Sequence, residues 1–385
     1  MEIIENKTNY SFDELIGIAR RDNNPKRTYL FVNYIQAKHI PVCPGKALDL
    51  FSQLGKELAD SYGNERTTII GFAETATAVG AAVALCFKGG TPYLHTSREG
   101  IDISKNIVSF EEEHSHAIEQ KLFCGCPEEF IIKADRIIFI EDEITTGKTI
   151  LNFIRVLRQK NLINDRTKVT AASIVNGMNE AHAEAFKRAG ANFHYLVKIR
   201  YDQSIDPFSG LSYSQQEEGA ADWRGMAAQS IFSVKGRVDP RTGVIVREYE
   251  ESCRELADGV IEILKERVAS GSSVLVLGTE EFMYPAIFAA KKISEAFNIS
   301  CIKVHSTTRS PIVPHGEKGY PIKSRFGLTS FYSQQRQTFL YNLSRYDKAI
   351  VLTDSEKPFG SEFESLSGKL AKLGCKEIIG IRWVE

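Results

Sequence analysis

The chain has 385 residues, of which 43% are hydrophobic and 25% charged, and its formal net charge is −1 at pH 7. This composition is typical of a globular protein with a sizeable core and two or three domains, and the balanced charge does not favour a nucleic-acid or membrane partner. We expect a cytoplasmic protein. The seven scattered cysteines suit a reducing compartment, Met1–Glu5 does not resemble a signal peptide, and no apolar run is long enough to span a bilayer.

The first 61 residues predict a helix, a strand and a second helix. Ser11, with Glu14 three residues later, matches a capping box and predicts a short helix over 11–20. The apolar residues 29–32 predict a strand, and a longer helix is expected over roughly 46–61.

Two apolar runs then each end in a loop of small and polar residues. Thr67 to Ile70 predicts a buried strand, which enters Gly71-Phe72-Ala73-Glu74-Thr75-Ala76-Thr77 and then a helix. Pro92 to His95 predicts the next strand, which enters Thr96-Ser97-Arg98-Glu99. A loop at a helix N-terminus presents backbone N–H groups that can hold an anion. For the first loop, an ordinary strand-to-helix turn is the alternative.

Residues 100–128 show no strong hydrophobic period and include Glu112, His114 and His116. A segment of this length between two strands is either disordered or a functional lid. Exposed loop histidines are the simpler interpretation of His114 and His116.

The most informative stretch is residues 137–149. Ile137 to Ile140 predicts a fully buried strand, which ends at Glu141 and Asp142. The loop Thr145-Thr146-Gly147-Lys148-Thr149 follows, and apolar residues of helical period begin at Ile150. Such a loop suits a phosphate, whereas the two carboxylates suit sugar hydroxyls or Mg²⁺. A ribose phosphate at the carboxyl end of the strand satisfies both demands.

Gly147-Lys148-Thr149 also matches the end of a P-loop, the phosphate-binding loop of many nucleotide hydrolases. That motif requires a glycine five residues before Gly147, where Asp142 stands. The P-loop interpretation is therefore disfavoured.

Residues 137–149 resemble the motif with which type I phosphoribosyltransferases bind 5-phosphoribosyl 1-pyrophosphate (PRPP). The resemblance implies an α/β fold with a parallel sheet and an N-terminal hood, in which Lys38 and His39 are candidate base contacts or part of a solvated loop. It implies that Glu141 and Asp142 contact the ribose and, directly or indirectly, Mg²⁺. The residues implied for the 5-phosphate are Thr145, Thr146, Gly147, Lys148 and Thr149.

The same resemblance implies roles for the earlier loops. Arg98 would contact PRPP phosphates, with Glu141 and Asp142 as the other catalytic residues. Residues 100–128 would close over PRPP and exclude water, with Glu112, His114 and His116 as lid candidates. Type I enzymes are often dimers that share a site, so the resemblance also allows a homodimer in which Arg98 acts across the interface. The residues implied for pyrophosphate are Ala73, Glu74, Thr75, Ala76 and Thr77.

The C-terminal part repeats this alternation of strands and helices. After strands over 168–175 and 193–199, residues 203–242 break the pattern. Strands are then predicted over 274–277, 302–305, 349–352 and 376–381, which suggests an internal duplication. Chance similarity between strand–helix units is the alternative. The second copy lacks the Thr-Thr-Gly-x-Thr loop, so we do not expect it to bind PRPP in the usual way. Arg309 and Ser310 are its candidates for another anion.

Thr308-Arg309-Ser310-Pro311 resembles the signature of the TRSP domain. This domain follows a phosphoribosyltransferase-like domain in a bacterial family linked to tellurium-resistance operons. The resemblance implies a PRPP-binding domain over 1–204, a connecting segment over 205–242 and a TRSP-type α/β domain over 243–385.

We therefore expect a Mg²⁺-dependent phosphoribosyltransferase. It would transfer the ribose 5-phosphate of PRPP to a nitrogenous acceptor and release pyrophosphate, in the synthesis of a nucleotide- or nucleoside-like metabolite. A non-catalytic PRPP- or nucleotide-binding regulator is the alternative.

Overall fold

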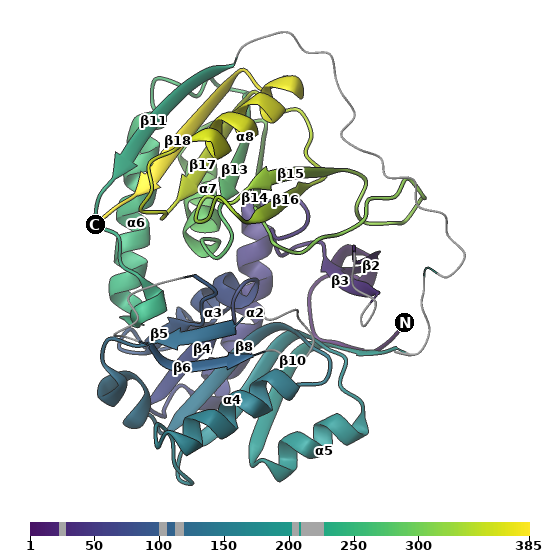
Figure 1. The fold of residues 1–385 in the computed structure, drawn as a ribbon, viewed down its shortest axis with the longest axis vertical. Helices are drawn as coiled ribbons and strands as arrows, with labels where there is room; N and C mark the ends of the chain where they lie inside the picture. The colour runs from purple at the N-terminus through teal and green to yellow at the C-terminus, as the bar shows by residue number, and fades with distance from the viewer. Residues whose placement is uncertain (23–27, 100–105, 112–118, 202–207, 209–226) are drawn as a thin grey trace. The chain divides into compact units, whose positions relative to one another are not determined.

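The computed structural model describes the chain except residues 23–27, 100–105, 112–118, 202–207 and 209–226. Its contacts divide the chain into two compact units, each made of separated segments (Figure 1). Unit 1 comprises Met1–Phe12, Asp49–Ser204 and Val238–Glu251. Unit 2 comprises Asp13–Leu48, Ile205–Arg237 and Ser252–Glu385. The segments of both units are thus interleaved along the sequence.

Unit 1 is built on a seven-stranded sheet in the order β1–β10–β9–β8–β4–β5–β12. The five central strands are parallel, and β1 and β12 pair antiparallel at its two edges. This confirms the predicted mostly parallel sheet, whose strands read as apolar runs because both faces are buried. The strands are β1 (Glu2–Asn6), β4 (Thr67–Gly71), β5 (Pro92–His95), β8 (Arg136–Ile144), β9 (Lys168–Asn176), β10 (Ala191–Arg200) and β12 (Val244–Ile245).

Helices and a hairpin complete unit 1. Its principal helices are α2 (Pro44–Tyr62), α3 (Ala76–Ala84), α4 (Lys148–Gln159) and α5 (Glu180–Arg188). Strands β6 (Asn106–Glu111) and β7 (Glu119–Phe123) form the hairpin, and the one-turn helices η2 (Glu128–Ile132) and η3 (Pro240–Thr242) lie outside the sheet. Helix α3 packs tightly on β4, because a Cβ at Gly80 would lie 3.1 Å from the Gly71 Cα. Helix α4 buries the predicted apolar stripe of Ile150, Phe153, Ile154 and Leu157.

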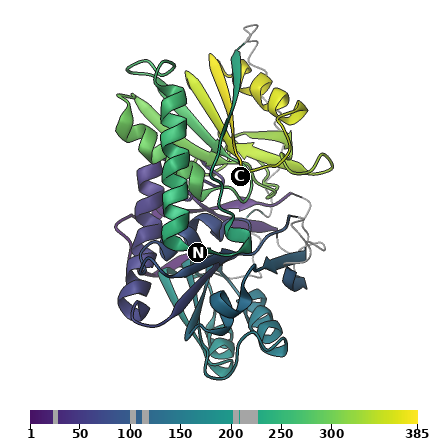
Figure 2. The ribbon, with the colours of Figure 1, turned by 90° about the vertical axis from the view of Figure 1, so that its left-hand side faces the viewer.

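Unit 2 contains a five-stranded, fully parallel sheet in the order β11–β18–β17–β13–β14. Figures 1 and 2 show helices α6 and α8 on opposite faces of this sheet. The sheet strands are β11 (Ala228–Val234), β13 (Ser273–Gly278), β14 (Cys301–Ser306), β17 (Lys348–Thr353) and β18 (Glu377–Trp383). The helices are α1 (Phe12–Leu15), α6 (Val246–Leu264), α7 (Tyr284–Ala296) and α8 (Ser361–Lys372). Two hairpins pair β2 (Ile16–Arg20) with β3 (Tyr29–Asn33), and β15 (Arg325–Thr329) with β16 (Gln337–Tyr341).

The two sheets share one strand order. Strands β13, β14, β17 and β18 of unit 2 follow the order of β4, β5, β8 and β9 of unit 1. The place of β10 is taken by β11, which comes before the other four strands in the sequence. An internal duplication predicts this shared order of four strands. The outermost strand of unit 2, β11, differs because it precedes the other four strands in the sequence.

The structure corrects the expectations for three segments. The helix predicted over 11–20 is limited to α1, because Ile16 to Arg20 pair with β3 instead. The segment 100–128 contains strands β6 and β7, which were not predicted, and η2 begins at its last residue. Lys38 is 1% exposed, and its Nζ donates to the carbonyl oxygens of Glu280 and Thr307 at 3.4 Å each, so the solvated-loop interpretation of Lys38 is wrong.

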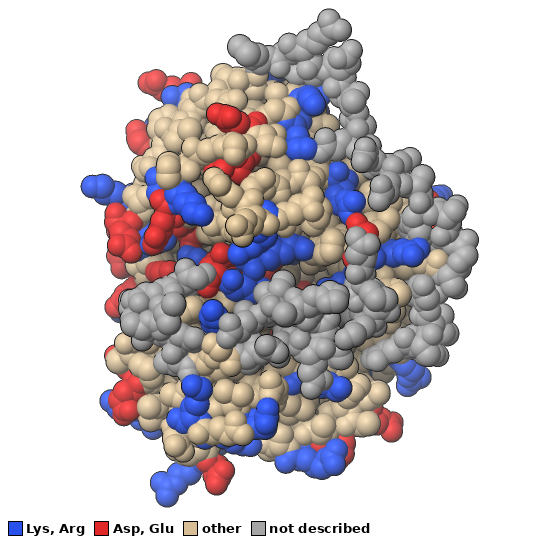
Figure 3. Space-filling model, viewed as in Figure 1, with Lys and Arg blue, Asp and Glu red and all other residues tan. Residues whose placement is uncertain are grey.

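The face shown in Figure 3 carries both basic and acidic side chains among the described residues, and the formal net charge of the whole chain is −1. Among the described helices, none combines the length and apolar character needed to cross a membrane.

Candidate active site

The loops selected from the sequence leave the same edge of the unit 1 sheet. We call residues 73–77 the first loop and residues 145–149 the second loop. Gly71, at the end of β4, pairs with His95 on one side and with Ile140 on the other. The first loop, the Arg98 segment and the stretch from Glu141 onward therefore start from neighbouring strands at their carboxyl ends, where ligands bind in open α/β sheets.

The three carboxylates of residues 141–143 lie within β8, which is longer than predicted. Pairing with β4 ends at Ile140, but pairing with β9 continues to Ile144 and Asn176. The side chains of all three acidic residues are half-buried. The strand extends because β9 supplies a ladder partner that the local sequence does not reveal.

The second loop depends on glycine at position 147. Gly147 has a φ of 68° at the N-terminus of α4, and a Cβ there would lie 2.1 Å from Cε2 of Phe186. Gly147 itself has no side chain that could cap this helix, and the Lys148 N–H donates to Thr146 Oγ1 at 3.4 Å. The backbone N–H groups that follow in the first turn of α4 make this end of the helix suitable for an anion.

Lys198 and Asn176 support the turn beside the second loop. The Gly177 N–H donates to the Ile144 carbonyl at 2.8 Å. Lys198 Nζ donates to Asn176 Oδ1 at 3.1 Å and to the Met178 carbonyl, and burial lowers the pKa of Lys198. Sequence reasoning missed both side chains, because only the pairing of β9 with β10 brings them together.

His182 lies close enough to Lys148 to respond to its charge. Burial, followed by the positive charge of Lys148, lowers the pKa of His182. We therefore expect a neutral imidazole beside the second loop at pH 7.

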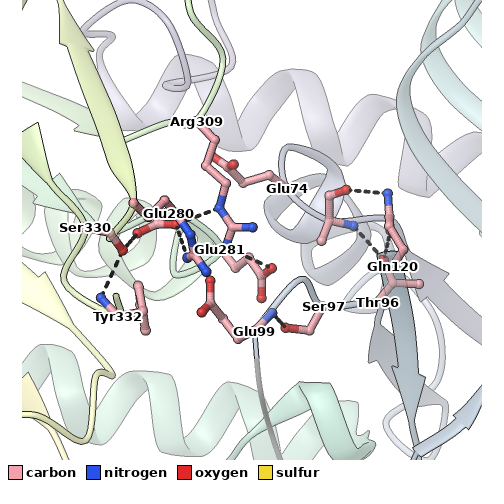
Figure 4. Close-up of polar contacts among 12 residues, drawn as sticks. Glu74, Thr96, Ser97, Glu99, Gln120, Glu280, Glu281, Arg309, Ser330 and Tyr332 are labelled. Atoms are coloured by element: carbon pink, nitrogen blue, oxygen red, sulfur yellow. Dashed lines mark hydrogen bonds and ion pairs between the residues drawn. The ribbon is translucent and has the colours of Figure 1, made fainter. Parts of the chain in front are cut away.

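The first loop is held at its first residue by two buried side chains (Figure 4). The Ala73 N–H donates to Thr96 Oγ1 at 2.8 Å, and the Thr96 hydroxyl donates to Gln120 Oε1 at 2.5 Å. Gln120 Nε2 donates to the Ala73 carbonyl at 2.9 Å. Ala73 and Glu74 are joined by a cis peptide bond. Gln120 could not be selected from the sequence, since nothing in its neighbourhood predicted a strand.

The remaining residues of the first loop and the Arg98 segment are also ordered by hydrogen bonds. Glu74 is buried, and its carbonyl accepts from the Thr77 hydroxyl at 3.2 Å. The Tyr93 hydroxyl donates to the Thr77 carbonyl at 2.7 Å. Arg98 is half-buried, next to a turn in which the Glu99 N–H donates to Ser97 Oγ at 3.0 Å. The lid candidates Glu112, His114 and His116 lie outside the described residues.

The carboxylates of β8 suit a metal ion that shares its ligands with a substrate. Within the described residues, no three His, Cys, Asp or Glu side chains are grouped to hold a metal. Mg²⁺ commonly uses one or two protein carboxylates together with substrate phosphates and water. Glu141 and Asp142 fit that donor set, whereas a cage made of protein side chains alone does not fit the described part of the site.

The corresponding edge of unit 2 repeats the backbone bonds of unit 1. The Thr307 N–H donates to the Gly278 carbonyl at 3.0 Å, as the Thr96 N–H does to Gly71 at 2.9 Å. Thr307 Oγ1 accepts from the Glu280 N–H at 2.9 Å, which is the counterpart of the bond from Ala73 to Thr96. Arg309 thus occupies the position in unit 2 that Arg98 occupies in unit 1.

In unit 2, carboxylates lie at the positions that correspond to the first and second loops of unit 1. Glu280 is fully buried, and its carboxylate accepts from Arg309 Nε at 2.7 Å, from an Arg336 guanidinium nitrogen at 2.9 Å and from the Ser330 hydroxyl (Figure 4). At the N-terminus of α8, the Gly360 N–H donates to Glu362 Oε1 at 2.8 Å.

The chain matches a family model described as "Phosphoribosyl transferase" over residues 15–204, and a model described as "TRSP domain C terminus to PRTase_2" over residues 240–367. It belongs to the phosphoribosyltransferase family that carries a C-terminal TRSP domain. Both loops of this phosphoribosyltransferase-family chain lie in the first matched region, and Thr308-Arg309-Ser310-Pro311 lies in the second. The predicted family and α/β fold class are thereby confirmed.

Solved phosphoribosyltransferases resemble this family member at low identity. The adenine phosphoribosyl transferase from Trypanosoma brucei, in complex with AMP, pyrophosphate and ribose-5-phosphate, has a TM-score of 0.39 at 15% identity and covers 55% of this chain and 88% of its own. The orotate phosphoribosyltransferase from Aeropyrum pernix has a TM-score of 0.27 at 17% identity and covers 48% and 87%. No curated protein sequence matches the chain.

Proposed function

We propose that the chain is a Mg²⁺-dependent phosphoribosyltransferase whose site lies at the carboxyl edge of the unit 1 sheet. The observation that carries this proposal is the register of β5, β4 and β8, from which two helix-N-terminal loops, Arg98 and a pair of carboxylates all start. The family of the chain supports the same class of reaction.

The second loop would hold the 5-phosphate of PRPP. The N–H groups at the start of α4 carry partial positive charge, and Gly147, with its φ of 68°, allows the tight turn that leads the loop into this helix. Thr145, Thr146 and Thr149 would add hydroxyl donors. Glu141 and Asp142 would accept hydrogen bonds from the ribose hydroxyls.

The reaction would be a displacement at C1 of the ribose. A nitrogen atom of the acceptor forms a bond to C1, while the bond from C1 to the pyrophosphate oxygen breaks and its electron pair leaves with pyrophosphate. Glu141 and Asp142 would stabilise the positive charge that develops at C1. The first loop and Arg98 would bind the leaving pyrophosphate, since the Arg fork matches phosphate oxygens in pairs. Mg²⁺, held by Glu141 and Asp142 with substrate oxygens, would supply further charge neutralisation.

Titration calorimetry with PRPP, with and without Mg²⁺, tests the binding part of the proposal. We expect Mg²⁺-dependent binding to the wild type and its loss in Glu141→Gln/Asp142→Asn. Glu143→Gln is the matched control, because it removes a half-buried carboxylate from the same strand. Equal affinity of the double variant and the wild type would contradict the site assignment.

Pyrophosphate release distinguishes the enzyme from a PRPP-binding regulator. With a panel of purine, pyrimidine and amide acceptors, we expect release by the wild type but not by the double variant. Binding without release for every acceptor would favour the regulator. Four further expectations stay predictions: a nucleotide- or nucleoside-like product, a homodimer, a cytoplasmic location and a link to tellurium resistance.

A further inference from the structure

We propose that Gln120 is a positioning residue that holds the first loop in its pyrophosphate-binding geometry. This inference rests on the proposed function. Gln120 lies on β7, outside both loops, and no feature of the sequence marks it as part of the site.

The hydrogen bonds among Ala73, Thr96 and Gln120 form a closed ring. The donor directions are fixed around it, because a backbone N–H can only donate and a backbone carbonyl can only accept. Thr96 must therefore donate its proton to Gln120 Oε1, and Gln120 must present its NH₂ group to the Ala73 carbonyl. Both peptide groups of Ala73 are thus committed to side chains from two other segments.

The ring is buried, so each of its bonds is costly to break. Ala73 is 4% exposed, Thr96 is 0% and Gln120 is 1%. Away from water, a polar group that loses its partner pays its full desolvation penalty, and connected hydrogen bonds reinforce one another. The first residue of the loop is therefore held far more rigidly than an exposed strand-to-helix turn.

The ring also connects the first loop to the Arg98 segment. Next to Gln120, Lys121 exchanges two backbone bonds with Ser97, at 2.8 and 2.9 Å. Gln120 therefore links the first loop to the strand that aligns residues 96–99. In the proposed function, the first loop and the Arg98 segment bind one pyrophosphate together, so the distance between them must stay constant. Small misplacements of binding groups reduce reaction rates strongly.

Unit 2 shows that the fold does not require this ring. Phe339 exchanges two backbone bonds with Thr308, as Lys121 does with Ser97. Thr338 therefore occupies the position of Gln120, and its hydroxyl donates to the Leu328 carbonyl at 3.4 Å. The bond from Glu280 to Thr307 is kept, but no amide closes the ring, and the Glu280 carbonyl accepts from Lys38 Nζ at 3.4 Å instead. The complete ring belongs to the unit in which we place the pyrophosphate site.

Two ligands separate a positioning role from a merely structural one. Ribose 5-phosphate would contact the second loop but has no pyrophosphate, whereas PRPP would contact both loops. In Gln120→Met and in Gln120→Glu, which keeps the shape but loses the NH₂ donor, we expect PRPP affinity in the presence of Mg²⁺ to fall, by up to about 100-fold. Ribose 5-phosphate affinity should change less than twofold.

Thr96→Val breaks the ring at Thr96 instead of Gln120. It should lower PRPP affinity relative to ribose 5-phosphate affinity by the same factor, and it provides the test if a Gln120 variant does not fold. Thr338→Val, at the equivalent position of unit 2, is the control and should leave both affinities unchanged. Unchanged PRPP affinity in folded Gln120 and Thr96 variants, or an equal loss for both ligands, would overturn the inference. Failure of the wild type to bind PRPP would instead contradict the proposed function.

Discussion

Position 147 of the candidate site has no room for a side chain. An alanine at φ 68° costs about 1–2 kcal/mol, and its Cβ would meet Phe186 at 2.1 Å. We expect Gly147→Ala to distort the start of α4 and to reduce PRPP affinity at least tenfold. Titration calorimetry and thermal unfolding of the same samples provide the measurement.

Gly190 offers a matched control for the backbone cost alone. It has a φ of 70°, but a Cβ there would meet no atom within 4 Å. Gly190→Ala should lower the unfolding temperature and leave PRPP affinity unchanged. If both alanine variants bind PRPP as the wild type does, the second loop is not the 5-phosphate site.

At the scale of elements, the loops of unit 2 are joined by a buried ionic cluster. Glu280 follows β13, Arg309 follows β14, and Arg336 precedes β16. Glu280→Gln would remove the buried carboxylate that accepts from both Arg309 and Arg336, which we expect to cost about 3–5 kcal/mol of unfolding free energy. Urea unfolding measures the change.

The control for this prediction is an exposed ion pair. Glu295 contacts Lys291 and Lys292 on the surface of α7, with its side chain 45% exposed. Glu295→Gln should cost less than about 1 kcal/mol, because exposed pairs contribute little. Similar losses in both variants would mean that Glu280 is not the centre of the cluster.

The elements that could be predicted from the sequence are those whose side chains are buried on both faces. The parallel strands read as apolar runs because both faces are covered, as in Ile137 to Ile140. The hairpin β6–β7 was missed because it lies outside the seven-stranded sheet and its sequence shows no strong hydrophobic period. Strand β2 was taken for a helix because the local capping pattern says nothing about β3, its partner. Gln120 and Lys198 were missed for the same reason, since their partners depend on strand register.

At the scale of the whole molecule, one buried histidine makes stability depend on pH. Burial, assisted by the charge of Lys38, lowers the pKa of His305 from 6.5 to about 4. Its Nε2 accepts from the Tyr341 N–H at 3.2 Å, which places the proton on Nδ1, toward the Ala37 carbonyl. Between pH 6.5 and 4 the unfolded chain therefore binds a proton that the folded chain does not. Stability should fall as the pH falls through this window, by about 3 kcal/mol in all.

Unfolding free energies at pH 7, 5.5 and 4.5, for the wild type and His305→Gln, provide the measurement. Glutamine can replace both hydrogen bonds of His305 but does not titrate. The unfolding free energy of His305→Gln should therefore depend less on pH than that of the wild type, by the contribution of one titrating proton. Arg66 holds the pKa of Asp135 at about 2, so that carboxylate affects stability only below this window. Parallel profiles for both proteins would contradict the assignment.

The stoichiometry of PRPP binding follows from the difference between the two units. The carboxylates of Glu280 and Glu362 lie in unit 2 at the positions that correspond to the two loops of unit 1, and they accept hydrogen bonds there. We therefore expect titration calorimetry to give one PRPP per chain. A value of two would show that the second unit also binds the ligand.

The upstream origin of β11 has a consequence for how the chain acquires its fold. The one sheet neighbour of β11 among the described strands is β18, with Ala228 opposite Glu377. A strand made early during synthesis must therefore wait for the last strand of its sheet before it can pair. Contacts of such long sequence separation form slowly. A ribosome-bound chain that stops before residue 377 would leave β11 unpaired while the central strands of unit 1 are already complete.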